Sequence, residues 1–193
     1  MDTLVASKNE YRRSKIHPKK FALMVACASI TMMFAAFTSA YIVRQAQGNW
    51  LEFKLPSVFF MSTVVILFSS LTLHASYLSF KRGNERAYKL LLVLSLILGF
   101  GFVGMQYQGW LALQAIGIEL TTNPSGSFVY VISGVHAAHV LGGIAALAVA
   151  CLHAFGLPYK VTPQRKLRFE MTLIYWHFVD LLWVYLLLFF MMQ

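Results

Sequence analysis

The sequence predicts an all-α, polytopic membrane protein with five transmembrane helices. Of its 193 residues, 59% are apolar and only 12% charged, with a mean hydropathy of +0.65. Soluble domains have about 45–50% apolar and about 25% charged residues. Five stretches provide the roughly 20 apolar residues that a helix needs to cross about 30 Å of hydrocarbon. This composition excludes disordered, collagen-like and disulfide-scaffold proteins.

Each stretch is bounded by a change in composition. The first follows a basic tail, and it is too long for a secretory signal of about 7–15 apolar residues, so we expect it to remain uncleaved. The second and third are separated by a basic loop, the fourth follows turn-forming residues, and the fifth opens at Glu170. Residues 1–20 are expected to form a basic cytoplasmic tail, and 21–193 a single membrane domain. The predicted spans are 21–43, 56–80, 90–113, 128–155 and 171–192.

Lysine and arginine are distributed unequally between the connections. Six lie in the N-terminal tail, four in the loop 81–89 and four in 160–168, whereas the other side has only Arg44 and Lys54. Positive charge accumulates on the cytoplasmic side of membrane proteins. We therefore expect the N-terminus inside, the C-terminus outside, and contacts with lipid headgroups rather than with nucleic acid.

Four polar residues lie deep inside the last two spans. At 1.5 Å per residue, His139 lies about 16 Å below the outer edge and Asp180 about 15 Å above the inner edge, which is nearly the same level. We predict a His139–Asp180 hydrogen bond or ion pair, with His136 and His177 one turn away on the same faces. The alternative, a local His177–Asp180 contact within one helix, stays open.

A second polar group is expected at the inner boundary, formed by His74, His153 and Glu170. Alternatively, Glu170 caps the positive end of the helix dipole, and the two histidines are ordinary residues of the membrane–water interface. Two histidines three residues apart also raise the possibility of a metal site or a b-type haem site. His139 and His177 lie at depths that would allow them to bind the same haem. No cysteine or glutamate cluster supports a dinuclear centre, and hydrogen bonds between helices account better for these residues.

Small residues also indicate close packing of helices. Two glycine groups should mark such places, and Cys27 and Cys151 should act as small buried apolar residues. The glycines are Gly99, Gly101, Gly104, Gly134, Gly142 and Gly143.

Two motifs resemble subunit III of the haem-copper oxidases in its five-helix form. Phe169-Glu170 followed by the run from Tyr175 to Trp183, YWHFVDLLW, is similar to the family's FE…YWHFVDxxW, and Ser133 to Val140, SGVHAAHV, is similar to TGxHxxHV. Weaker similarities are Phe68-Ser69-Ser70 and Phe102 to Gln106. The resemblance covers all five predicted helices in order. It departs where Ser29 is followed by Ile30, because the family often has a glutamate there.

The resemblance implies a non-catalytic subunit of an aerobic cytochrome c oxidase, with haem and copper held by partner subunits. It implies contact with oxidase subunit I and also subunit II, bound phospholipid, support of proton uptake, and location in a bacterial inner membrane. We expect Arg165, Lys166 and Arg168 to hold lipid phosphate, because arginine binds phosphate through two nitrogens. A role credited to the family's glutamate is not carried over to Ile30.

Other functions stay open from the sequence. Subunit III of a quinol oxidase shares the five-helix plan, and a b-type haem electron carrier is an alternative of a different class. An ion transporter is disfavoured by the odd number of helices and the lack of an internal repeat. Membership of a respiratory supercomplex also stays open.

Overall fold

The computed structural model describes residues 17–121 and 123–192, which form five long helices and no strand. All five are long and apolar enough to cross a membrane. The predicted all-α, five-span fold class is confirmed, whereas the orientation of the termini stays a prediction. Most of the basic tail, residues 1–16, lies outside the described residues. The helices are α2 (Pro18–Gln45), α3 (Ser57–Lys81), α4 (Glu85–Ala115), α5 (Pro124–Gly156) and α6 (Pro163–Met192).

Most of the helices extend past the predicted apolar spans because their first turns are polar and capped. The side chains of Asn84 and Asn123 accept hydrogen bonds from backbone N–H groups at the starts of α4 and α5. Pro124 and Pro163 occupy first helical positions, where a missing N–H costs nothing. Hydropathy finds the part of a helix that lies in hydrocarbon and misses these capped turns.

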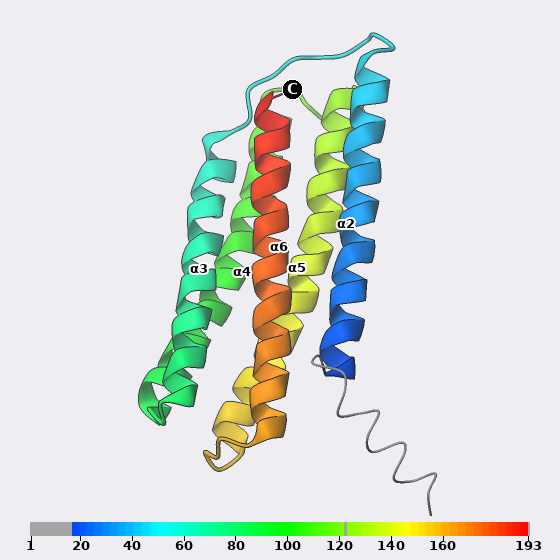
Figure 1. Ribbon diagram of the computed structural model, residues 1–193. Helices are drawn as coiled ribbons and strands as arrows, with labels where there is room; N and C mark the ends of the chain where they lie inside the picture. The colour runs from blue at the N-terminus through cyan, green and yellow to red at the C-terminus, as the bar shows by residue number, and fades with distance from the viewer. Residues whose placement is uncertain (1–16, 122, 193) are drawn as a thin grey trace, which may run out of the picture.

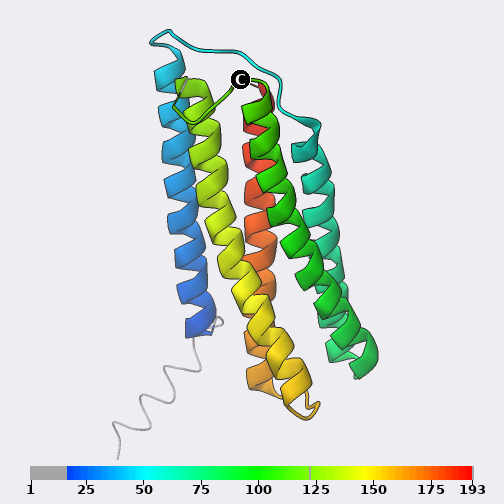
Figure 2. The same ribbon diagram turned by 180° about the vertical axis from the view of Figure 1, so that it is seen from behind.

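The helices form two layers, with α3, α6 and α2 in one and α4 and α5 in the other (Figures 1 and 2). α6 contacts α2, α3 and α5, and α4 contacts α5 within the second layer and α3 of the first layer. The last helix of the chain is therefore the central one. The two predicted motif segments lie on neighbouring helices, since α5 carries one and α6 the other.

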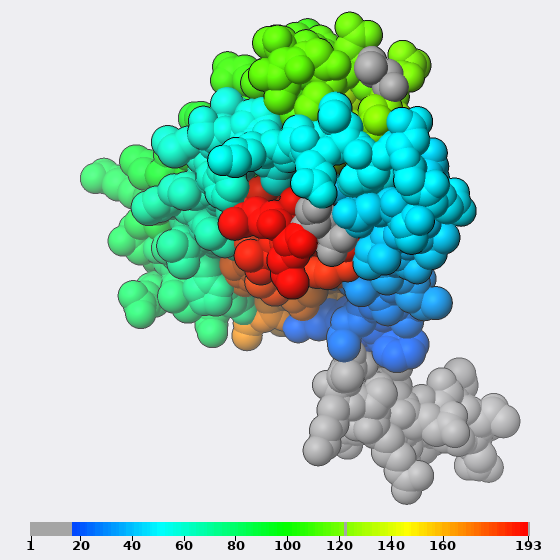
Figure 3. All heavy atoms as spheres, turned by 90° about the horizontal axis from the view of Figure 1, so that it is seen from above, coloured from blue at the N-terminus to red at the C-terminus, as the bar shows by residue number. Residues whose placement is uncertain are grey.

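One end of the bundle contains the start of α2, the α3–α4 turn and the α5–α6 connection, and we call it the basic end (Figure 1). The basic loops 81–89 and 160–168 lie here. The C-terminus lies at the other end, where the connection 46–56 crosses from α2 toward α3 (Figure 3). The alternation of basic and non-basic connections thus corresponds to two ends of one bundle.

α2 is the least buried helix. Only 11% of its most apolar window is buried, against 28–44% in the other four helices. Its buried side chains are Phe34, Thr38 and Tyr41, and Thr38 shares a 2.9 Å hydrogen bond with the Tyr185 hydroxyl of α6. Much of the apolar surface of α2 is therefore exposed.

Candidate functional site

The centre of the bundle is closed by Trp176, which is fully buried between two glycines. A Cβ atom at Gly99 of α4 would lie 2.8 Å from the Trp176 ring, and one at Gly143 of α5 would lie 2.9 Å from it. The predicted close packing is confirmed at these two glycines. It is wrong at Gly101, Gly104, Gly134 and Gly142, where a Cβ would meet nothing closer than 3.6 Å. Spacing along a helix does not show which glycines face a bulky ring.

A second buried layer surrounds His136, which has no solvent exposure. Its ring stacks on Trp183 with centroids 5.1 Å apart, and the edges of Phe34 and Phe102 complete the enclosure. Neither imidazole nitrogen has a hydrogen-bond partner among the described residues. The indole N–H of Trp183 donates to Thr63 Oγ1 at 2.9 Å. α3, α5 and α6 are thus joined by rings and by one polar contact.

The predicted His139–Asp180 pair is wrong. Nδ1 of His139 donates to the carbonyl oxygen of Val135 at 2.8 Å, and the ring packs against Phe34 of α2 at 5.7 Å. Asp180 is 2% exposed, and neither carboxyl oxygen has a hydrogen-bond partner among the described residues. Equal depth did not bring the two together because His139 is turned toward α2, away from α6.

The alternative His177–Asp180 contact is also wrong, because His177 uses both ring nitrogens toward α3. Nδ1 is hydrogen-bonded to the Ser70 hydroxyl, and Nε2 lies 3.4 Å from Nδ1 of the exposed His74. His74 therefore belongs with His177 and not with the inner polar group that the sequence suggested. Since His177 faces α3 and His139 faces α2, they are not placed as two axial ligands of one haem.

Glu170 connects three helices near the basic end. Its carboxylate accepts hydrogen bonds from Lys20 of α2 and from the Tyr77 hydroxyl of α3, and Lys166 lies 4.0 Å away. Because α6 begins at Pro163, Glu170 lies beyond its first turn, and the predicted capping role is wrong. No sequence pattern pairs Lys20 with Glu170, because the two residues are 150 positions apart and Lys20 belongs to the basic tail that indicates topology.

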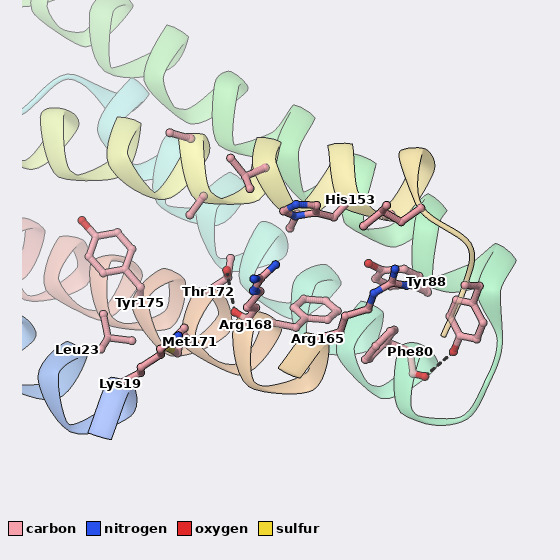
Figure 4. A pocket seen from close by; sticks show the side chains of 18 residues that line it. Lys19, Leu23, Phe80, Tyr88, His153, Arg165, Arg168, Met171, Thr172 and Tyr175 are labelled. Atoms are coloured by element: carbon pink, nitrogen blue, oxygen red, sulfur yellow. Dashed lines mark hydrogen bonds between the residues drawn. The ribbon is translucent and has the colours of Figure 1, made fainter. Parts of the chain in front are cut away.

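A groove of about 1030 Å³ opens at the basic end between α2, α5 and α6 (Figure 4). Its apolar wall includes Leu23 and Val149 together with small residues of α5. Lys19, His153, Arg165 and Arg168 supply the polar part of the lining. His153 lines this groove, whereas His74 and Glu170 do not.

The three expected phosphate ligands are divided by the structure. Arg165 and Arg168 line the groove, whereas Lys166 does not line it and lies near Glu170. Arg165 Nη1 also donates to the carbonyl oxygen of Pro158 at 2.6 Å, which fixes the α5–α6 connection. The sequence missed Lys19, which reaches the same groove from α2.

Tyr159 closes the groove from the α5–α6 connection. Its hydroxyl donates to the carbonyl oxygen of Phe80 at 2.7 Å (Figure 4). Burial raises the pKa of Tyr159 above its ordinary value, and the nearby Glu85 acts in the same direction. The phenol therefore stays a neutral hydrogen-bond donor at physiological pH.

The remaining ligand-type residues are dispersed. Cys151 is buried and Cys27 half-buried, and both are free. In the part of the chain that the structure describes, no three histidine, cysteine, aspartate or glutamate side chains come together as a metal site. The candidate site thus has three parts: the buried polar residues His136 and Asp180, the hydrogen-bonded row Ser70–His177–His74, and the groove.

Comparisons with known proteins cover nearly the whole bundle. Residues 20–193 match the family described as cytochrome c oxidase subunit III. Cytochrome c oxidase subunit 3 of Thermostichus vulcanus is 27% identical over 88% of this chain and 86% of its own length. The probable cytochrome c oxidase subunit 3 of Nocardia farcinica is 27% identical over 95% of both chains, and that of Mycobacterium leprae is 29% identical over 89% of both. The chain belongs to the cytochrome c oxidase subunit III family.

Proposed function

We propose that this chain is a non-catalytic core subunit of an aerobic cytochrome c oxidase in a bacterial inner membrane. Its main contact is oxidase subunit I, with subunit II and further oxidase subunits in the same complex. The family match over residues 20–193 is the observation that carries this proposal. The large exposed apolar surface of α2 is consistent with a helix that meets lipid or another subunit.

The groove at the basic end is proposed to hold a phospholipid. Its wall of small and branched apolar residues suits an acyl chain, and cations from α2 and α6 lie where a phosphate would sit. Arg168 is the leading phosphate ligand because its planar guanidinium offers paired donors, with Lys19 opposite as a second charge. Arg165 also has a structural role, because it donates a hydrogen bond to the carbonyl oxygen of Pro158. Lys166 forms an ion pair with Glu170 and is not proposed as a phosphate ligand.

The lipid proposal is tested by counting the phospholipids that the purified oxidase retains, using native mass spectrometry. The combined Arg168→Gln and Lys19→Gln variant should lose one tightly held phospholipid per complex. Lys166→Gln is the matched control, since it removes one positive charge from the same helix but not from the groove. An unchanged lipid count in the double variant, or an equal loss in the control, would contradict the proposal.

The chain is also proposed to stabilise subunit I and to support proton uptake during oxygen reduction, with the basic end on the cytoplasmic side. The positive residues gathered in the connections at this end favour that orientation. Oxidase stripped of this chain should retain its haem spectrum and its initial oxygen consumption. It should then lose activity during continued turnover faster than the intact complex. Stripped oxidase that keeps full activity throughout would contradict this role.

A further inference from the structure

Asp180 is an acid at the centre of a membrane bundle with no partner to explain it. It is 2% exposed, and neither carboxyl oxygen has a hydrogen bond among the described residues. A lone carboxylate in such a place is costly, whereas a carboxyl that takes up a proton is not. Ser70 of α3 is hydrogen-bonded to His177, which lies one helical turn before Asp180 on α6.

A row of polar side chains leads from Asp180 to the surface along the seam between α3 and α6. The Ser70 hydroxyl is hydrogen-bonded to Nδ1 of His177, and Nε2 of His177 lies 3.4 Å from Nδ1 of His74. The two imidazole rings are 5.6 Å apart between centroids. His74 is exposed and lies about 10 Å along α3 from Lys81. The row therefore runs from the buried Asp180 to a side chain that is exposed on the surface of this chain.

We propose that Asp180 is a proton-exchanging carboxyl supplied from the surface through His74, His177 and Ser70. His74 takes a proton at Nε2 and passes the Nδ1 proton to Nε2 of His177. His177 passes its Nδ1 proton to Ser70, whose own hydroxyl proton moves to Asp180 after the hydroxyl rotates. One proton leaves the surface and the carboxylate becomes a neutral carboxylic acid; the reverse transfers return it.

Few other titratable groups lie near this row. On α3 they are His74 itself and Tyr77, whose hydroxyl is bonded to Glu170, and on α5 His136 is buried with its ring stacked on Trp183. On α2 the side chain facing α6 is the hydroxyl of Thr38, which is bonded to Tyr185. Lys20 and Glu170 are bonded to each other nearer the basic end. Proton exchange at Asp180 is therefore controlled by the histidine pair.

The test is infrared difference spectroscopy on the assembled oxidase, following the C=O band of a protonated carboxyl that Asp180→Asn removes. The rate at which this band shifts in D₂O measures exchange. His74→Gln should slow the shift about tenfold or more, as loss of a positioned proton carrier does. His17→Gln is the matched control, an exposed histidine at the start of α2 that lies outside both the row and the groove, and should leave the rate unchanged. Ser70→Ala should slow exchange as His74→Gln does.

A second probe is Zn²⁺, which binds neutral imidazoles. Added Zn²⁺ should slow the shift in the native complex and have no effect on the His74→Gln variant. The proposal is overturned if Asp180→Asn removes no carboxyl band at any pH. It is equally overturned if both His74→Gln and Zn²⁺ leave the exchange rate unchanged.

Discussion

α5 and α6 pack in opposite ways at the bundle centre and at the basic end. At the centre, Gly143 leaves space that the ring of Trp176 fills, with a hypothetical Cβ only 2.9 Å from it. Toward the basic end, the same helices and α2 leave a groove of about 1030 Å³ between them.

The difference shows that small residues serve two purposes in this chain. A glycine facing a tryptophan allows dense packing, whereas alanines facing a gap leave room for another molecule. The dense centre fixes the positions of the helices, and the open end is available for binding. Substitutions that add volume should therefore have unequal effects in the two regions.

The largest effect should come from adding volume at the centre. Gly143→Val places a side chain where the Trp176 ring lies, and we expect it to destabilise the bundle by about 1–3 kcal/mol or to prevent assembly. Gly104→Ala is the control, because a Cβ there meets nothing within 4 Å. Denaturant unfolding of the purified chain in detergent measures both. Equal stability of the two variants would contradict the packing account.

The next effect concerns the connection of three helices by Glu170. Glu170→Gln removes the charge that holds Lys20 and the Tyr77 hydroxyl, and should cost about 1–2 kcal/mol. Hydrogen exchange should increase at the start of α2. Glu85→Gln is the control, since its pair with Lys89 is local and more exposed, and such pairs contribute about 0.3–0.5 kcal/mol. Unchanged exchange at the start of α2 would argue against a tie between the helices.

A smaller effect is expected from one buried hydrogen bond at the centre. Thr63→Val keeps the side-chain shape and removes the acceptor of the Trp183 N–H, for a loss of about 0.6–1.7 kcal/mol. Thr31→Val on α2 is the control, because that hydroxyl bonds only its own helix at the exposed surface. The comparison fails if both variants unfold at the same denaturant concentration.

The smallest change in stability should follow from filling the groove. Ala145→Leu adds volume to α5 on the groove wall, and the free energy of unfolding should change by less than about 0.5 kcal/mol. Phospholipid retention should nevertheless fall. A stability loss as large as that of Gly143→Val would mean that the groove is part of the packed core.

The sequence predicted the features that depend on composition along a single helix. It missed the contacts that depend on the direction in which side chains point. The five apolar spans and the burial of His136 and Asp180 follow from hydropathy and depth. The hydrogen-bond partner of His177 does not follow from hydropathy and depth, because side chains at equal depth on two helices can face different neighbouring helices. Only the position of α6 between α2, α3 and α5 turns His177 toward Ser70.

The same limit applies to the charged residues. Counting lysines and arginines located the basic end but did not separate Arg168, which lines the groove, from Lys166, which lies near Glu170. The groove itself had no sequence pattern, because α2 is distant in the chain from α5 and α6, with which it forms the groove. The alanines of α5 and the cations of α2 and α6 gain meaning only when they face each other.

The most direct test of the oxidase assignment is to purify the tagged chain in a gentle detergent and record its visible spectrum before and after its partners are stripped away. The account predicts that a haem-copper subunit I copurifies, that haem absorbance accompanies the complex, and that the stripped chain shows none. A chain that purifies alone and still carries a Soret band would contradict it and would identify a histidine-ligated cytochrome instead.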